Sequence, residues 1–280
     1  MSVRALAYAK INLSLRVIGV RPDGYHEIVS DVQTIDLSDR LTVDLDGNGV
    51  HIDNDLVMRG QDLVERATAE LRARKECASG VRIEVRKSIP AGAGLGGGSS
   101  DAAAVLNVLD QLTPPSLPFK ALCAVGAAIG SDVPLFLYGG RLRIRGRGER
   151  VERLSTASPS KRFVVVVPSS RCDTAAIYAR WDEIAKRKGA ARRNDSARGE
   201  NDLLRPALDV HPELVEYHEA VGSFESDCHG MSGSGSSFYV AFEDPQIAER
   251  AYAELMQRFA SASVFICRPT DAGHRIEEST

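Results

Sequence analysis

Apolar residues alternate with polar ones along the first part of the chain and later recur at helical spacing. Residues 5–20 place four apolar side chains at every second position, which predicts a strand with one buried face. Further strands are predicted over residues 28–37, 41–45 and 81–85. Apolar side chains that share one helical face predict helices over residues 56–74 and 101–112.

The second half of the chain holds more strand-like segments than helical ones. Its predicted strands cover residues 142–144, 163–167, 238–242 and 264–267, and its predicted helix covers residues 248–259. Residues 186–200 are charged and aperiodic, so a loop is expected there. Since strands and helices do not alternate strictly, the expected fold class is α+β rather than a doubly wound parallel sheet. A stretch rich in Ser, Thr and Pro from residue 154 predicts a boundary between two units, residues 1–153 and 154–280.

The composition is that of a globular protein. Of 280 residues, 43% are hydrophobic and 26% are charged, and the net charge of −3 argues against a general binder of polyanions. No apolar run approaches the ~20 residues that a membrane span needs, and charged residues interrupt the segment where a signal peptide would have its core. The five cysteines form no CxxC pair, so neither a disulfide framework nor a zinc site is predicted. A cytoplasmic, reducing location is expected.

The strongest chemical signal is a glycine- and serine-rich loop between a predicted strand and a predicted helix. Glycines let backbone N–H groups approach an anion, and the positive end of the following helix dipole favours a di- or triphosphate. A flexible linker or a tight turn is the structural alternative. The residues expected to bind the phosphates are Pro90, Ala91, Gly92, Ala93, Gly94, Leu95, Gly96, Gly97, Gly98, Ser99 and Ser100.

Three familiar phosphate-binding motifs fit this loop poorly. A Walker loop needs a lysine where Gly98 stands. The glycines at 92, 94 and 97 match GxGxxG, but Asp110, the acidic residue near the expected distance, ends a predicted helix rather than a strand. The HRD and DFG sequences of protein kinases do not occur.

The loop resembles the phosphate loop of the GHMP small-molecule kinase superfamily, and four further segments follow that superfamily's order. Residues 9–13 (AKINL) resemble its opening strand, residues 130–134 (GSDVP) its catalytic turn and residues 231–236 (MSGSGS) its C-terminal glycine motif. Residues 21–26 (RPDGYH) resemble a signature of the branch that phosphorylates a cytidine-diphosphate-linked methylerythritol. The resemblance implies an α+β, two-lobed GHMP-kinase fold, with an N-terminal ribosomal-protein-S5-like nucleotide lobe and a C-terminal α/β-sandwich lobe.

The same resemblance implies an activity. ATP with Mg²⁺ would be the co-substrate, its γ-phosphate would pass to the 2-hydroxyl of the methylerythritol, and no tightly bound prosthetic group is expected. Lys10 would be the catalytic cation and Asp132 the general base. The residues implied in substrate binding are Asn12, Tyr25, His26, Thr174 and Tyr178, with the tyrosines stacking on cytosine and His26 reading its edge.

Two details of the implied site stay open. Ser99 and Ser100 are both candidate ligands of Mg²⁺. The superfamily carries an asparagine near adenine, whereas residues 54–57 here read Asn-Asp-Leu-Val and displace it by one place. No adenine contact is therefore predicted.

Local chemistry allows other interpretations of these residues. Lys10 could extend to the surface, Asp132 could cap a helix, and Tyr25 could cover the core. Another GHMP kinase, for mevalonate, homoserine or a sugar, is the alternative activity, and a non-catalytic nucleic-acid-binding or regulatory module is the alternative class. Such a module would use the alternating arginines of residues 141–147, which otherwise predict a solvated sheet face. The expected partners are small-molecule substrates, with neither nucleic acid nor a membrane.

Overall fold

The strands form two sheets in the computed structural model, which describes residues 2–45, 49–54, 62–76, 80–155, 158–188 and 200–277. In this part of the chain the larger sheet has seven strands, in the order β11-β1-β2-β4-β3 with β5 beside β2 and β6 beside β5. Its described strand pairs are antiparallel, except that β3 and β4 are parallel. The strands are β1 (Ser2–Val20), β2 (His26–Asp44), β3 (Val50–Asn54), β4 (Val81–Arg86), β5 (Arg141–Gly146), β6 (Arg150–Arg153) and β11 (His274–Glu277).

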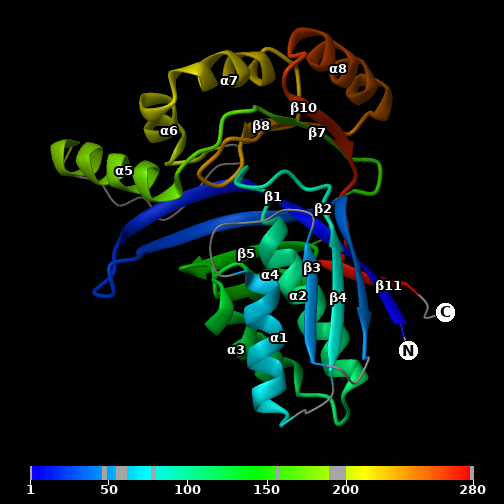
Figure 1. The fold of residues 1–280 in the computed structure, drawn as a ribbon. Coiled ribbons are helices and arrows are strands. Elements are labelled where there is room, and N and C mark those ends of the chain that lie inside the picture. The colour runs from blue at the N-terminus through cyan, green and yellow to red at the C-terminus, as the bar shows by residue number, and fades with distance from the viewer. Residues whose placement is uncertain are drawn as a thin grey trace.

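The two longest strands, β1 and β2, form a ribbon that runs through the middle of the molecule. They pair along nearly their whole length and meet at the turn of residues 21–25. The other edge of β2 is shared, because residues 28–33 pair with β5 and residues 40–44 pair with β4. In Figure 1 the ribbon separates the smaller sheet above from the helices of the larger sheet below.

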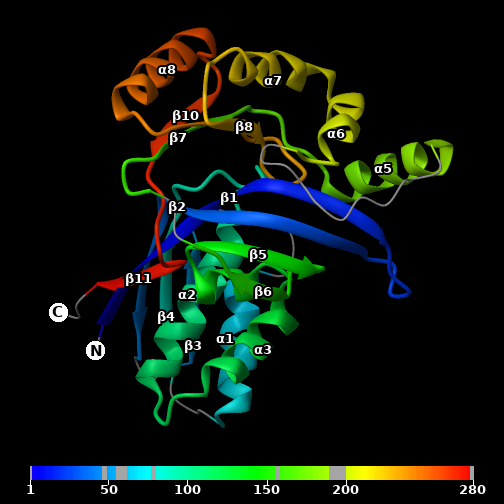
Figure 2. The same ribbon diagram turned by 180° about the vertical axis from the view of Figure 1, so that it is seen from behind.

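Helices pack against one face of the larger sheet, as both ribbon views show (Figures 1 and 2). They are α1 (Leu63–Arg74), α2 (Gly97–Leu112), α3 (Phe119–Ile129) and α4 (Val133–Tyr138). Helix α2 lies at the centre, and its residues 102–106 are completely buried. The small side chains of the alanines at 102, 103 and 104 let this helix approach the sheet closely. The start of α2 is thereby held at a fixed place beside β1.

The smaller sheet packs on the β1–β2 ribbon and carries its own helices. Its strands run in the order β10-β7-β9-β8, with β7 (Arg162–Val167), β8 (Cys228–Met231), β9 (Phe238–Phe242) and β10 (Ser263–Cys267). The helices of this part are α5 (Thr174–Lys188), α6 (Leu204–Val210), α7 (Val215–Gly222) and α8 (Pro245–Arg258), with a 3₁₀ turn at Pro212–Leu214. Between ribbon and sheet lies a separate apolar core that joins Ile11 and Leu13 to Phe163 and Tyr239.

The predicted strands agree with the structure better than the predicted helices. Residues 238–242 form β9 as predicted, whereas the two strands predicted over residues 28–37 and 41–45 are one strand, β2, which ends at Asp44. Helix α2 begins at Gly97, so Gly97, Gly98, Ser99 and Ser100 form its first turn instead of a loop. Helix α5 extends to Lys188, into the predicted loop. Residues 189–199 of that loop, like residues 56–61 of the predicted first helix, lie outside the described residues.

The last described strand, β11, was not anticipated and pairs with β1 in the larger sheet. The chain therefore returns to the first unit after completing the smaller sheet. The division into residues 1–153 and 154–280 stays a prediction, and residues 274–277 pair across it. None of the helices formed by the described residues combines the length and the apolar character that crossing a membrane requires.

Candidate active site

A cavity of about 1070 Å³ lies where the β1–β2 ribbon, the glycine-rich loop, α5 and the turn before α4 meet. It brings together all but two of the residues that the sequence singled out. Those that line it are Lys10, Asn12, Tyr25, His26, Pro90, Ala91, Gly92, Ala93, Gly94, Gly96, Gly97, Gly98, Ser99, Asp132, Thr174 and Tyr178. The two exceptions, Leu95 and Ser100, are buried below the loop.

The glycine-rich loop has a backbone that only glycine adopts easily. Gly96, which precedes the first turn of α2, has a φ of +75°. A Cβ atom on Gly94 would lie 2.2 Å from the carbonyl oxygen of Ser232, so the loop touches the second glycine motif. Gly96, Gly97 and Gly98 line the cavity, and the N-terminus of the 16-residue helix α2 therefore faces it. Free N–H groups and the helix dipole favour an anion there.

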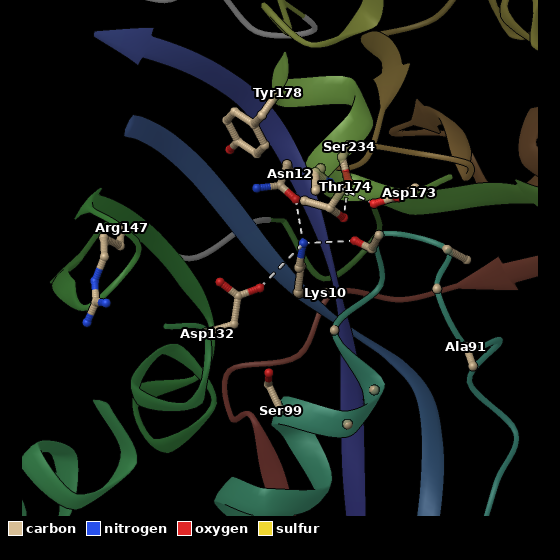
Figure 3. Close-up of a pocket in the computed structure, with 18 of the residues that line it drawn as sticks. Lys10, Asn12, Ala91, Ser99, Asp132, Arg147, Asp173, Thr174, Tyr178 and Ser234 are labelled. Atoms are coloured by element: carbon tan, nitrogen blue, oxygen red, sulfur yellow. Dashed lines mark hydrogen bonds and ion pairs between the residues drawn. The ribbon is translucent and has the colours of Figure 1, made fainter. Parts of the chain in front are cut away.

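Lys10 projects from β1 into this cavity and is held by three oxygen atoms. Its Nζ donates to Asn12 Oδ1 at 2.6 Å and to the Gly94 carbonyl at 2.8 Å, and it lies 3.9 Å from Asp132 Oδ2 (Figure 3). The residue is only 4% exposed, which excludes a lysine that extends to the surface. Burial lowers the pKa of Lys10, and the Asp132 carboxylate opposes that shift.

Asp132 occupies the N-cap position of α4, but its side chain forms no capping hydrogen bond. The carboxylate faces the Lys10 ammonium instead, and about a third of the side chain stays exposed to the cavity (Figure 3). The turn between β5 and β6 packs against it, because a Cβ atom on Gly148 would lie 3.2 Å from Asp132 Oδ1. The capping interpretation therefore has no hydrogen bond to support it.

Aromatic side chains gather at the other end of the cavity. The His26 ring packs on that of Tyr178, with centroids 4.5 Å apart, and meets Trp181 edge-on at 5.6 Å. His26 Nε2 forms a hydrogen bond of 2.9 Å with Asp182 Oδ1. Tyr25 is 55% exposed, so it does not cover the core as the alternative interpretation required.

Asn12 and Thr174 add further polar contacts to the cavity, on the side of the smaller sheet. Asn12 Nδ2 donates to Ser30 Oγ at 2.8 Å, and the Asn12 backbone N–H donates to Ser232 Oγ at 3.2 Å. Thr174 Oγ1 and Ser234 Oγ are 2.8 Å apart, which joins α5 to the second glycine motif (Figure 3). The polar groups of both units therefore converge on one cavity.

Comparison with known proteins identifies the family. The GHMP kinases N terminal domain family matches residues 62–140. A 4-diphosphocytidyl-2-C-methyl-D-erythritol kinase from Thermotoga maritima is 35% identical over 254 residues, which cover 86% of this chain and 92% of that protein. The chain belongs to this kinase family. A relative of the same name from Cupriavidus metallidurans is 37% identical over 260 residues, covering 89% of this chain and 87% of its own.

Solved structures agree with the family assignment. A crystal structure of 4-(cytidine 5'-diphospho)-2C-methyl-D-erythritol kinase aligns with a TM-score of 0.77 and 34% identity, covering 95% of this chain and 99% of the other. A homoserine kinase from Cytophaga hutchinsonii aligns with a TM-score of 0.73 at 16% identity, covering 99% and 97% of the chains. The second likeness shows the fold alone. The predicted α+β, two-lobed GHMP-kinase fold is confirmed, and the chain is a GHMP small-molecule kinase that uses ATP.

The alternating arginines of β5 have separate environments. Arg143 forms a two-point ion pair with Asp31 on β2, at 2.7 and 3.1 Å, as expected for an outer sheet face. Arg145 is exposed. Arg147 was grouped with them, yet it lies on the turn after β5 and lines the cavity, with its guanidinium over the Tyr25 ring. Alternation along a strand predicts the first two environments but not the third.

A buried charge cluster under the glycine-rich loop also escaped the sequence analysis. Lys87 Nζ lies 2.5 Å from Asp39 Oδ2 and 2.6 Å from Asp101 Oδ2, and both carboxylates are buried. Asp39 Oδ1 accepts from the backbone N–H groups of Ser88 and Ile89. The cluster thus ties β2, the approach to the loop and α2 together. Its members are far apart in the sequence, and no local pattern marks them.

Proposed function

We propose that this protein transfers the γ-phosphate of ATP to the 2-hydroxyl of 4-diphosphocytidyl-2-C-methyl-D-erythritol, in the non-mevalonate route to isopentenyl diphosphate. The observation that carries the proposal is the single cavity. It joins the Lys10–Asp132 pair to a glycine-rich anion site on one side and to the aromatic group of Tyr25, His26 and Tyr178 on the other. The relatives named for this kinase cover nearly the whole chain, which supports the same substrate.

The ATP phosphates would bind at the start of α2. Backbone N–H groups of residues 96–98 face the cavity there, and the helix dipole adds a favourable field for negative charge. The close packing of Gly94 on Ser232 fixes the loop in advance, so little ordering is needed when the nucleotide binds. Phosphoryl transfer depends mainly on such positioning and on electrostatic stabilisation.

Asp132 would act as the general base and Lys10 as the electrostatic partner. Asp132 would accept the proton of the 2-hydroxyl while the hydroxyl oxygen forms a bond to the γ-phosphorus and the bond to ADP breaks. The ammonium of Lys10 lies 3.9 Å from the Asp132 carboxylate, close enough to offset charge that develops on the transferred group. The hydrogen bonds from Lys10 to Asn12 and Gly94 hold the ammonium at that place.

Mg²⁺ fits the polar groups of this site, with Ser99 as the residue that would hold it. Ser99 lines the cavity, and its hydroxyl lies on the side of α2 that faces Asp132 (Figure 3). Ser100 is fully buried and donates to the Tyr8 carbonyl at 2.7 Å, so its hydroxyl is already used. Mg²⁺ typically takes one or two protein oxygens beside substrate phosphates, and it would offset the charge of the ATP phosphates.

The cytidylyl group would occupy the aromatic end of the cavity. Tyr25 and Tyr178 offer ring faces for stacking, and His26, whose ring packs on that of Tyr178, offers a ring nitrogen to the base edge. Asn12 and Thr174 lie between this end and Lys10, where the polyol of the substrate would pass. A mevalonate or homoserine kinase has no nucleobase to stack, so these rings favour the cytidylyl substrate over those alternatives. An enzyme that draws on ATP is expected in the cytoplasm, which we propose as its location.

A substrate panel tests the proposal. The protein is incubated with ATP and Mg²⁺ and, in separate reactions, with the cytidylyl substrate, mevalonate, homoserine and galactose, and ADP release is followed. We expect ADP release above the ATP-only background with the cytidylyl substrate alone. Faster turnover of another alcohol would assign the protein to a different GHMP activity, and no turnover of any alcohol would favour a non-catalytic module.

A further inference from the structure

Helix α5 presents three side chains to one histidine. Tyr178 stacks on the His26 ring, Trp181 meets it edge-on, and Asp182 accepts a hydrogen bond from it. These three positions are three and four residues apart, so they share one face of the helix. His26 belongs to the ribbon and α5 to the second unit, and the contacts therefore join the two units at the aromatic end of the cavity.

The two ring nitrogens of His26 have different environments. Nε2 lies 2.9 Å from Asp182 Oδ1, and the two side chains are 12% and 32% exposed. An ionised carboxylate can only accept a hydrogen bond, so Nε2 carries the proton. Within the described residues Nδ1 forms no hydrogen bond, although the residue lines the cavity. In the neutral ring Nδ1 is therefore a hydrogen-bond acceptor that is left for a ligand.

We propose that Asp182 is a positioning residue, which fixes this tautomer of His26 and thereby makes the site select cytosine over uracil. The inference rests on the proposed cytidylyl substrate. Cytosine carries an amino group, a donor, where uracil carries a carbonyl oxygen, an acceptor. An acceptor nitrogen accepts a hydrogen bond from the amino group of cytosine. Opposite the carbonyl oxygen of uracil it finds no donor, and a polar group left without a hydrogen bond in a closed site weakens binding.

The role of Asp182 can be separated from that of the ring contacts. Without the carboxylate, Tyr178 and Trp181 still pack on the imidazole, so His26 stays near its place. The proton can then move to Nδ1, which becomes a donor that suits uracil. Asp182→Asn keeps the size of the side chain but can donate or accept through its amide, so it tolerates either tautomer. Asp182→Ala removes the partner altogether.

The test is calorimetric binding of CDP and UDP at pH 8, where a histidine side chain is ordinarily neutral. We expect wild type to bind CDP about ten- to a hundredfold more tightly than UDP. In Asp182→Asn and Asp182→Ala this ratio should fall to about threefold or less, because CDP binding weakens and UDP binding does not. Glu183→Gln is the matched control, since Glu183 is the next residue of α5, pairs with Arg180 and does not line the cavity. It should keep the wild-type ratio.

Different results would contradict different statements. An unchanged CDP-to-UDP ratio in both Asp182 variants would overturn the inference, and so would an equal loss of affinity for the two nucleotides, which indicates a structural role. Melting curves of each variant show whether it is folded under the conditions of the titration. Failure of the wild type to bind CDP at all would instead refute the proposed cytidylyl substrate, on which the inference rests.

Discussion

The guanidinium of Arg147 lies over the ring of Tyr25, 4.8 Å from its centroid. Both residues line the cavity, Tyr25 from the β1–β2 turn and Arg147 from the β5–β6 turn. The Arg147 turn is firmly held, because the Arg147 backbone N–H donates to Glu149 at 2.6 Å and Gly148 packs on Asp132. The carboxylate of Asp23, on the turn that carries Tyr25, also interacts with this guanidinium, which helps to lower the pKa of Asp23. We expect this cation at the aromatic end of the cavity to contact the diphosphate of a cytidylyl substrate.

Arg147→Gln should raise the KM for the cytidylyl substrate about tenfold and leave the KM for ATP unchanged. The change removes one charge-assisted hydrogen bond, worth roughly 1.5–3 kcal/mol, and keeps much of the side-chain length. Steady-state kinetics with each substrate varied in turn measure both constants. Arg145→Gln is the control, because Arg145 is exposed on β5, two residues before Arg147, and does not line the cavity. Equal effects of the two substitutions would mean that the arginines act on the substrate through their long-range electrostatic field and that Arg147 makes no direct contact with it.

Tyr25→Ala should raise the same KM by about ten- to a hundredfold. One aromatic face lost from a stacked base costs about 1–3 kcal/mol, and the cation–π contact that holds Arg147 disappears with it. Tyr25 is more than half exposed, so the folded state should lose little stability. The measurement is again the KM for each substrate, together with a melting curve. A parallel rise in the KM for ATP would point to a change in the fold.

Asp132→Asn should lower kcat by about 10²–10⁴ and leave the affinity for ATP nearly unchanged. The variant keeps the size of the side chain but removes the proton acceptor. Because the Asp132 side chain forms no capping hydrogen bond, a fall in kcat cannot be attributed to the loss of a helix cap. Single-turnover kinetics and nucleotide binding separate the two quantities. Near-normal turnover would refute the assignment of Asp132 as the base.

Gly98→Val should weaken ATP binding at least tenfold without a large loss of stability. Gly98 lines the cavity, and a Cβ atom there would meet only Leu63, at 3.8 Å. A branched side chain would therefore fill the space of the phosphates rather than disturb the core. Gly96→Val is a poorer probe, because Gly96 has a φ of +75° and its Cβ would lie 2.8 Å from Phe136. Nucleotide titration and thermal melting of both variants should show loss of binding alone for the first and loss of both for the second.

The catalytic pair could be predicted from the sequence because its motifs are local. Lys10 and Asp132 each lie in a short run that resembles a family motif, and the structure brings them within 3.9 Å. Arg147 and Asp182 could not be predicted in this way. Arg147 continues the alternation of β5, in which Arg143 pairs with Asp31 and Arg145 is exposed, and Asp182 lies in an amphipathic helix that was itself not predicted. Their roles arise only when separate elements are packed together.

The fold, too, could be predicted from the sequence only where the pattern of residues is local. Period-two alternation located β4 and a short apolar run located β9, whereas the apolar helices α3 and α4 have too few polar positions to show a clear helical period. The start of α2 was placed four residues late, because glycines are poor helix formers and only the tertiary fold holds them in a helical turn. Strand β11 was missed because its pairing with β1 joins the two ends of the chain.

The buried cluster under the glycine-rich loop should make stability depend on pH. Burial is the main cause that raises the pKa of Asp101 to about 8, Asp39 adds to it, and Lys87 opposes it. In the unfolded chain this carboxyl titrates near its ordinary value of about 4. The folded protein therefore keeps a proton on Asp101 that the unfolded chain releases between about pH 4 and pH 8, and the resulting stability is lost as pH rises through that window.

Asp101→Asn should remove this contribution, because an amide resembles the protonated carboxyl and does not titrate. Between pH 5 and pH 8 the free energy of unfolding of wild type should fall relative to that of the variant, by at most about 1.4 kcal/mol per pH unit. The pKa of Lys87 is raised, so the stability that Lys87 contributes is lost only in the alkaline range, outside this window. Denaturant unfolding of both proteins at each pH gives the difference. A difference that stays constant from pH 5 to pH 8 would mean that Asp101 is ionised in the folded protein throughout. The effect of Lys87 on the pKa of Asp101 would then outweigh the opposite effects of the burial of Asp101 and of the charge of Asp39.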